Sequence, residues 1–330
     1  MRRAWMLAVI GMSMSVLCLA ARADDAGTVL RYKWVEGQQD SVAVSVDTAG
    51  TIVATTAAGT QTTSPKVHAE LTMFSRVDKV TPEGLAQMKI SFGLISFDTT
   101  TPDGKVVHGE MNLADSTMLI TVDGQKTTQP LPPGSTEMLS KGFTPILDDR
   151  GQVKGMVGGG SLQDAFAKLP GAGGAPNIGQ MMSGLDPILP EKAVKVGDVW
   201  EITLPLGQLL GQPTAKPIAL RFKYEDDEKL DDVLCRHFSA VANVSDLTIS
   251  IPPGLGGGMR TDMTGFNVQA TTDYYLSMDD THVVLAKSKA IEGGTLHIQG
   301  TQKGADGADV PVDMTMTLED FKVTTEMKRQ

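Results

Sequence analysis

The sequence predicts an all-β fold, built mainly from antiparallel sheets that could curve into half-barrels, with a short glycine-rich helical insert. Apolar and polar residues alternate with a period of two along most of the chain, which indicates strands with one buried face. Turns rich in Gly and Asp separate these stretches at regular spacing, as is typical of antiparallel all-β proteins. Residues 155–187 break the alternation and contain the insert.

The first 23 residues are expected to be a signal peptide. Arg2 and Arg3 form a positive start, residues 5–20 are uncharged and mostly apolar, and Ala21-Arg22-Ala23 offers the small residues that signal peptidase reads. A retained membrane anchor is the alternative interpretation. We therefore expect an exported protein, periplasmic or extracellular, cleaved after Ala23 and without a transmembrane span in the mature chain.

The mature chain would be strongly acidic. Arg2, Arg3 and Arg22 account for three of the 29 Lys and Arg residues, which leaves 26 basic residues against 39 acidic ones, a net charge of −13. Nucleic acid requires clustered basic residues, so it is excluded as a partner. Cys18 lies in the signal peptide, and Cys235 alone cannot form an internal disulfide.

Residues 24–154 are expected to form an N-terminal β-rich half. Turns are predicted at residues 47–50, 81–84 and 123–124, where Asp-Gly indicates a hairpin. The alternating apolar residues around these turns include Leu30, Tyr32, Trp34, Val42, Val44, Val46, Leu71, Met73, Met88, Ile90, Phe92, Leu94, Met118, Ile120 and Val122.

Residues 188–330 are expected to form a C-terminal β-rich half. It begins with LPEKAVKVGDVW (residues 189–200), in which Gly197-Asp198 predicts a tight turn and Trp200 the apolar anchor of the next strand. The later strands are predicted from residues such as Ile202, Leu204, Leu220, Phe222, Phe238, Ala240, Leu285, Leu296, Met314 and Met316.

Residues 155–187 allow two interpretations, a flexible linker between the halves or a flap with an apolar underside. Ser161 could cap a short helix that Pro170 ends, and a second apolar patch follows a run rich in glycine. If the segment is a flap, its apolar side chains would bind the ligand. The candidate ligand-binding residues are Leu162, Phe166, Leu169, Ile178, Met181, Met182 and Leu185.

No catalytic, cofactor-binding or metal-ligating residues are predicted, and no cofactor is expected. The five histidines show no zinc-protease spacing, and there is no CxxC pair. Cys235 and His237 would share one face of a strand, but no third group is evident to orient a catalytic pair, and His237 is expected to be solvated. The acidic run at 225–228 is interpreted as a solvated hairpin tip, because it lacks the spacing of a calcium loop.

Tyr32 with Gly37, the turn over residues 143–151 and the stretch over residues 189–200 together resemble secreted bacterial β-rich families of unknown function. The strand, Asp-Asp turn and strand of residues 274–287 are similar to hairpins in periplasmic half-barrels that hold lipids or lipoproteins. The resemblance covers most of the mature chain and implies no catalytic residues.

The sequence therefore predicts an exported binding or cell-envelope protein rather than an enzyme. Its expected partner is an apolar small molecule or a lipid, and the oligomeric state stays open. The alternatives are a secreted hydrolase whose catalytic residues meet only in space, and a purely structural envelope component. An apolar pocket would favour binding, whereas perturbed carboxylates or a Cys–His contact in a cleft would favour an enzyme.

Overall fold

The computed structural model describes residues 27–57, 59–101, 104–113, 115–131, 142–158, 187–204, 218–251, 259–303 and 309–330. Every regular element in these ranges is a β-strand, which confirms the all-β prediction. The predicted signal peptide and the helical pieces within 161–185 lie outside the described residues.

Among the described residues, fifteen strands form one antiparallel sheet. In the first half they are β1 (Gln39–Thr56), β2 (Gly59–Thr63), β3 (Lys66–Val80), β4 (Ala86–Thr100), β5 (Val106–Asn112), β6 (Thr117–Val122), β7 (Gln125–Pro130), β8 (Pro145–Leu147) and β9 (Val153–Met156). In the second half they are β10 (Val199–Leu204), β11 (Ile218–Leu230), β12 (Val233–Ile251), β13 (Met259–Ser277), β14 (Val283–Lys303) and β15 (Asp309–Arg329).

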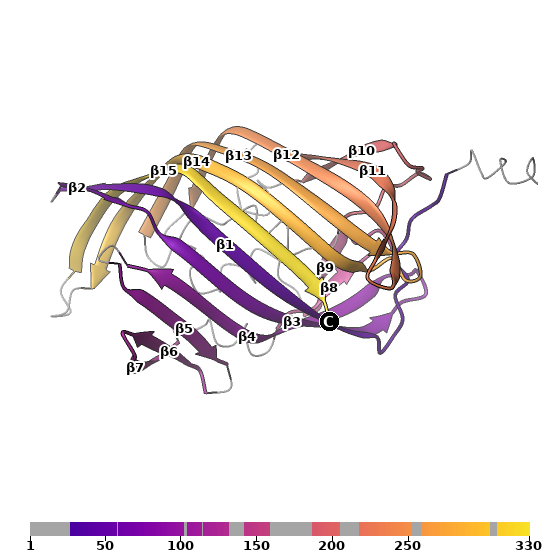
Figure 1. Cartoon of the computed structure of the whole chain (residues 1–330), viewed down its shortest axis with the longest axis horizontal. Coiled ribbons are helices and arrows are strands. Elements are labelled where there is room, and N and C mark those ends of the chain that lie inside the picture. The colour runs from indigo at the N-terminus through magenta and orange to yellow at the C-terminus, as the bar shows by residue number, and fades with distance from the viewer. Residues whose placement is uncertain are drawn as a thin grey trace, which may run out of the picture.

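The two halves of the chain meet in the middle of this sheet. The strand order is β10-β11-β12-β13-β14-β15-β1-β3-β4-β5-β6-β7, so the last strand pairs with the first. The short β8 pairs with β4 and β9, and β2 pairs with β1. Figure 1 shows the result as one strongly curved sheet, with β10 and β11 at one end and β5 to β7 at the other.

A line of β-bulges crosses five neighbouring strands. The register slips in the β12–β13, β13–β14, β14–β15 and β15–β1 ladders. Positive φ angles at Asp246 (54°), Gly265 (59°), Gly294 (154°) and Asp320 (46°) lie along the same line. A bulge bends its strand and increases the local twist, so this line explains much of the curvature in Figure 1.

Aromatic rings cover two of the glycines on this line, Gly50 and Gly294. A Cβ atom on Gly294 would come within 2.7 Å of the Phe266 ring and 2.8 Å of its Cα. At Gly50 a Cβ atom would lie 2.5 Å from the Phe321 ring. Residues 47–50 therefore do not form the turn that the sequence predicted: β1 runs through them, and Gly50 allows a bulge instead.

The N-terminal segment before β1 also differs from the prediction. Leu30 and Tyr32 are buried in the core, as their alternation indicates, but the segment is no strand. Its backbone contacts loops: Thr28 pairs with Val194, and the Tyr32 amide donates to the Asp149 carbonyl at 2.7 Å. The apolar side chains are therefore buried against the end of the sheet, without a ladder of their own.

The turn at Gly197-Asp198 is confirmed. Gly197 has a φ of 90°, and the Asp198 amide donates to the Lys195 carbonyl at 2.9 Å. β10 starts immediately afterwards, and the Trp200 ring stacks on Phe222 with 5.3 Å between centroids. Trp200 packs on the core as the predicted strand anchor.

Candidate functional site

One face of the sheet is apolar across ten strands, and we call it the inner face because it carries the buried core. One residue from each strand between β11 and β6 in the strand order lies directly opposite its neighbours, so that these residues form a single row across the sheet. Its members are Tyr224, Phe238, Tyr274, Ala286, Met327, Val44, Leu71, Ile95, Met111 and Met118. The inner face is therefore a continuous apolar surface rather than a set of separate patches.

The part of the inner face on β10–β15 and β1 is close-packed. Phe222, Phe238 and Phe266 are each 1% exposed, and Trp200 meets Phe238 edge-on at 5.5 Å. A cavity between β11 and β14 measures only about 10 Å³, which is at most the room that one water needs. This region is the hydrophobic core of the protein.

Buried polar side chains also lie on these strands, among them Thr272, Ser288, Glu292 and Thr325. The Thr272 hydroxyl donates to the Ser288 hydroxyl at 3.1 Å, so this buried pair is satisfied. The buried indole Nε1 of Trp200 has no hydrogen-bond partner among the described residues. Apart from the Glu292 carboxylate, these groups supply no general base, and apolar packing dominates this region.

The inner face continues onto β3–β6, where its apolar side chains are only half-buried. We call these residues the distal apolar surface. They are Leu71, Met73, Phe92, Ile95, Phe97, Met111, Met118 and Ile120. The Phe97 ring lies against Gly109, where a Cβ atom would come within 2.3 Å of it. Partly exposed Leu, Ile, Phe and Met side chains on a curved sheet offer contacts to an apolar ligand.

The opposite, outer face is polar, and imidazole–carboxylate pairs recur on it. His68 Nδ1 lies 2.8 Å from Asp47 Oδ1, and His108 Nδ1 lies 2.9 Å from Asp98 Oδ1. The four residues lie opposite one another across β1, β3, β4 and β5. The hydrogen bond to Asp47 raises the pKa of His68 above its ordinary value of 6.5.

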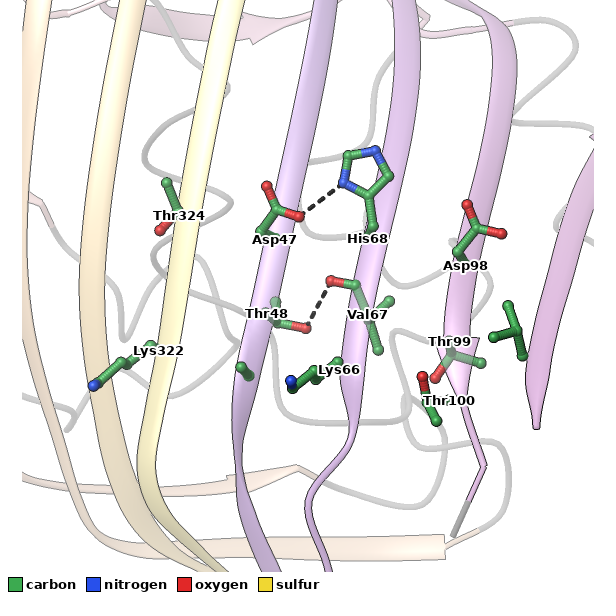
Figure 2. A pocket seen from close by; sticks show the side chains of 12 residues that line it. Asp47, Thr48, Lys66, Val67, His68, Asp98, Thr99, Thr100, Lys322 and Thr324 are labelled. Atoms are coloured by element: carbon green, nitrogen blue, oxygen red, sulfur yellow. Dashed lines mark hydrogen bonds and ion pairs between the residues drawn. The ribbon is translucent and has the colours of Figure 1, made fainter. Parts of the chain in front are cut away.

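A shallow hollow of about 350 Å³ lies on this outer face (Figure 2). Its lining residues are Asp47, Thr48, Ala49, Lys66, Val67, His68, Asp98, Thr99, Thr100, Val106, Lys322 and Thr324. Lys66 and Lys322 lie opposite Ala49 on the two neighbouring strands. The second nitrogen of His68 is 3.6 Å from the Glu70 carboxylate, and not from a hydroxyl or thiol that the imidazole could deprotonate. Lysines and carboxylates are mixed here, and no catalytic triad forms.

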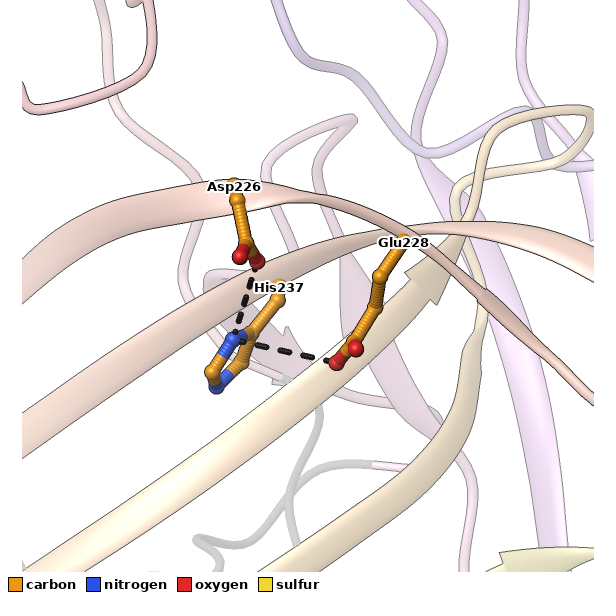
Figure 3. Close-up of side chains that lie close together, drawn as sticks. All are labelled: Asp226, Glu228 and His237. Carbon is orange, nitrogen blue, oxygen red and sulfur yellow. Dashed lines mark hydrogen bonds and ion pairs between the residues drawn. The ribbon is translucent and has the colours of Figure 1, made fainter.

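A second outer-face cluster surrounds His237 on β12 (Figure 3). Its Nδ1 lies 3.2 Å from Asp226 and 3.9 Å from Glu228, and its Nε2 lies 3.2 Å from Asp273. The ring stacks on Tyr275 at 4.7 Å, with 7° between the planes. The expectation of a solvated His237 is therefore wrong: its side chain is 19% exposed and faces three carboxylates.

The prediction of a hairpin tip at the acidic run 225–228 is also wrong. These residues belong to β11, which continues to Leu230, and the hairpin turn falls at Asp231-Asp232. A bulge between Tyr224 and Asp226 shifts the register, so Asp226 lies directly opposite His237. The period-two pattern alone would have put Asp226 on the same face as Tyr224. A bulge inside an acidic run leaves no clear signal in the sequence.

Cys235 does not form a catalytic pair with His237. The thiol is fully buried, and Sγ donates to the Val233 carbonyl at 3.6 Å. Burial raises its pKa above the ordinary value of 9.0, which disfavours the reactive thiolate. Both nitrogens of His237 face carboxylates, so no Cys–His contact supports a hydrolase.

The predicted ligand-binding residues Leu162, Phe166, Leu169, Ile178, Met181, Met182 and Leu185 lie outside the described residues. Among the residues that the structure describes, no helix is long and apolar enough to span a membrane.

No protein-family model and no curated protein matches the chain. Among solved structures, lipovitellin, described for its lipid–protein interactions, aligns with 8% identity and a TM-score of 0.42 over 90% of this chain and 25% of lipovitellin. The chain thus spans about a quarter of the lipovitellin chain.

Two bacterial structures also align. A DUF1329 family protein from Desulfovibrio piger has 8% identity and a TM-score of 0.17, with 88% of this chain and 84% of that chain covered. A domain named for outer membrane lipoprotein sorting, from Vibrio parahaemolyticus, has 8% identity and a TM-score of 0.17. The alignment covers 88% of this chain and 83% of that domain's chain. Neither alignment assigns a family to this chain.

Proposed function

We propose that the protein is an exported binding protein that holds an apolar ligand of the lipid class against the distal apolar surface. The observation that carries this proposal is the ten-strand row of the inner face, which is buried in the core strands and half-buried on β3–β6. An apolar surface that continues past the packed core costs free energy in water, about 25 cal/mol for each Å² left exposed. An apolar ligand would cover that area.

The chemistry of the surface favours binding over catalysis. The distal apolar surface consists of Leu, Ile, Met and Phe side chains, and Gly109 lies beneath the Phe97 ring. Aliphatic, thioether and aromatic side chains give non-directional contacts that suit acyl chains of different lengths. We therefore expect selection by apolar length and shape rather than by a particular polar headgroup.

The proposal is tested on β6, where inward and outward positions alternate. Ile120 lies on the inner face opposite Gly109, and Leu119 points to the other face, opposite Glu110. β6 lies next to the edge strand β7, away from the close-packed core, so a polar substitution there should leave the fold intact. Ile120→Asn and Leu119→Asn thus form a matched pair in one strand.

The measurement is titration with a fluorescent fatty acid, cis-parinaric acid, into the detergent-free mature protein. We expect wild type and Leu119→Asn to bind alike, and Ile120→Asn to bind at least tenfold more weakly, with thermal unfolding unchanged. Equal affinity in all three proteins, or no binding by wild type, would count against the proposal. In the second case a structural envelope role becomes the better hypothesis.

A further inference from the structure

Three carboxylates on β11 and β13 converge on the imidazole ring of His237, on the strand between them. Asp226 and Glu228 come from β11, His237 from β12 and Asp273 from β13. The ligand atoms of Asp226, Glu228 and His237 all lie within 4.8 Å of one another. Figure 3 shows both carboxylates pointing at the same ring nitrogen.

This arrangement differs from that of the other four histidines. His68, His108 and His297 have a single carboxylate at each paired nitrogen, and His282 faces the amide of Gln38 at 3.1 Å. At His237 two carboxylates meet at Nδ1, while a third contacts Nε2. The convergence on one nitrogen is therefore particular to His237.

The position of the ring is fixed from two sides. His237 Nε2 lies 3.2 Å from Asp273 Oδ1, within hydrogen-bond distance, and the ring stacks on Tyr275 at 4.7 Å. With its proton on Nε2, a neutral imidazole directs the Nδ1 lone pair at Asp226 and Glu228. A carboxylate on the far nitrogen is the usual partner of a metal-bound histidine, because it sets the tautomer and the ring orientation.

The spacing of the ligand atoms fits a small tetrahedral ion. Bonds of about 2.0 Å to nitrogen and oxygen place neighbouring ligand atoms of a tetrahedron about 3.3 Å apart. The distances from Nδ1 are 3.2 Å to Asp226 and 3.9 Å to Glu228, and all three ligand atoms lie within 4.8 Å of one another. The two exposed carboxylates would therefore have to move closer together to complete the coordination. Calcium requires six to eight oxygen ligands and does not fit one nitrogen with two carboxylates.

The local charge also favours a dication. Among the described residues, no lysine or arginine forms an ion pair with Asp226, Glu228 or Asp273, and Lys223 is paired with Glu225 instead. Three carboxylates therefore share one imidazole. Binding a doubly charged ion would offset their mutual repulsion.

We propose that His237 Nδ1, Asp226 and Glu228 form a binding site for a first-row transition-metal dication of the zinc class. Asp273 is a positioning residue that holds the Nε2 proton. The two carboxylates are exposed, with side-chain accessibilities of 61% and 45%, so the fourth coordination position is open to solvent. Such a metal would join β11 to β12 at their hairpin end.

The site is tested with Zn²⁺ alone, added to the chelator-treated mature protein in competition with a fluorescent zinc indicator. We expect one Zn²⁺ per wild-type chain and at least a tenfold loss of affinity in His237→Gln. Asp273→Asn should bind Zn²⁺ about 10–100-fold more weakly, which is the usual effect of removing a carboxylate that supports a metal-bound histidine. His297→Gln is the matched control, because it removes an outer-face histidine that faces only Asp313, and it should bind like wild type.

A second measurement locates the metal on the ring. In a ¹⁵N spectrum of the imidazoles, Zn²⁺ should shift the His237 Nδ1 resonance and leave Nε2 protonated. The circular dichroism of each variant without metal controls for folding. Equal affinity in wild type and His237→Gln, an equal loss in His297→Gln, or metal on Nε2 would overturn the proposal.

Discussion

Val44 in β1 and Met327 in β15 lie directly opposite each other and join the N-terminal and C-terminal halves of the chain into one sheet. Both side chains are buried, with exposures of 8% and 4%. They stand in the middle of the ten-strand inner row, between the close-packed core and the distal apolar surface. The pairing makes the sheet continuous, and with it the apolar face.

Met327→Ala should therefore destabilise the whole protein. Emptying a buried methionine site costs about 2–5 kcal/mol in the free energy of unfolding. Urea denaturation followed by tryptophan fluorescence measures it. Lys328→Ala is the neighbouring control: its Nζ makes a surface ion pair with Asp231 at 3.7 Å, worth at most about 1 kcal/mol. If Met327→Ala lowered the free energy of unfolding by less than Lys328→Ala does, the pairing of β1 with β15 would not be a main source of stability.

Trp200→Ala should cost about 3–5 kcal/mol of unfolding free energy, because it empties a large aromatic site against Phe222 and Phe238. Val199→Ala, next to it but 46% exposed, should change stability by less than about 0.5 kcal/mol. Thermal and denaturant unfolding check both variants. An unchanged midpoint for Trp200→Ala, with ligand binding lost, would make Trp200 a recognition residue instead of an anchor.

Gly294→Ala should destabilise by about 1–3 kcal/mol, since the added methyl group meets Phe266 at 2.7 Å and the φ of 154° is unfavourable for alanine. Gly155→Ala is the control, because the nearest atom to its Cβ would be 3.9 Å away and its φ is not in the positive range. Similar unfolding midpoints for the two variants would show that the bulge line tolerates side chains.

The ion pair of His68 and Asp47 should make stability depend on pH. The pKa of His68 is raised in the folded state, so the contribution is fully present below the unfolded value near 6.5 and is lost as pH rises through the folded pKa. Asp47→Asn should therefore destabilise more at pH 5.5 than at pH 8.5. An NMR titration should place the His68 midpoint above 6.5 in wild type and lower it in Asp47→Asn; an unchanged midpoint would refute the assignment.

Much of the fold follows from period-two patterns, and the departures have local physical causes. The alternation around Phe222, Phe238 and Tyr274 predicts both the strands and the buried face, because burying a side chain on every second residue fixes the register. Leu30 and Tyr32 show the same alternation without a ladder, since their side chains join the core while loops hold their backbone. Residues 47–50 have a turn composition, yet the long pairing of β1 with β15 keeps them in a strand.

The sites were harder to predict because they depend on pairings between distant strands. The alternation in the sequence continues from Phe92 to Leu94, but a register shift puts Ile95 on the inner face and leaves Leu94 exposed. Met118 alternates as predicted, and its partial exposure follows from its place near one edge of the sheet. The His237 cluster depends on the bulge at Glu225 and on Asp273 from the next strand. Neither is visible in the spacing of the residues along the chain.

Native mass spectrometry of the protein, purified from its own cells without detergent, tests the central claim most directly. If the distal apolar surface holds a lipid, wild type should carry an additional mass that organic solvent extracts and fragmentation identifies as a lipid. Ile120→Asn should carry less of it than Leu119→Asn. A wild-type spectrum with only the mass of the mature chain, together with no uptake of added fatty acid, would contradict the proposed function.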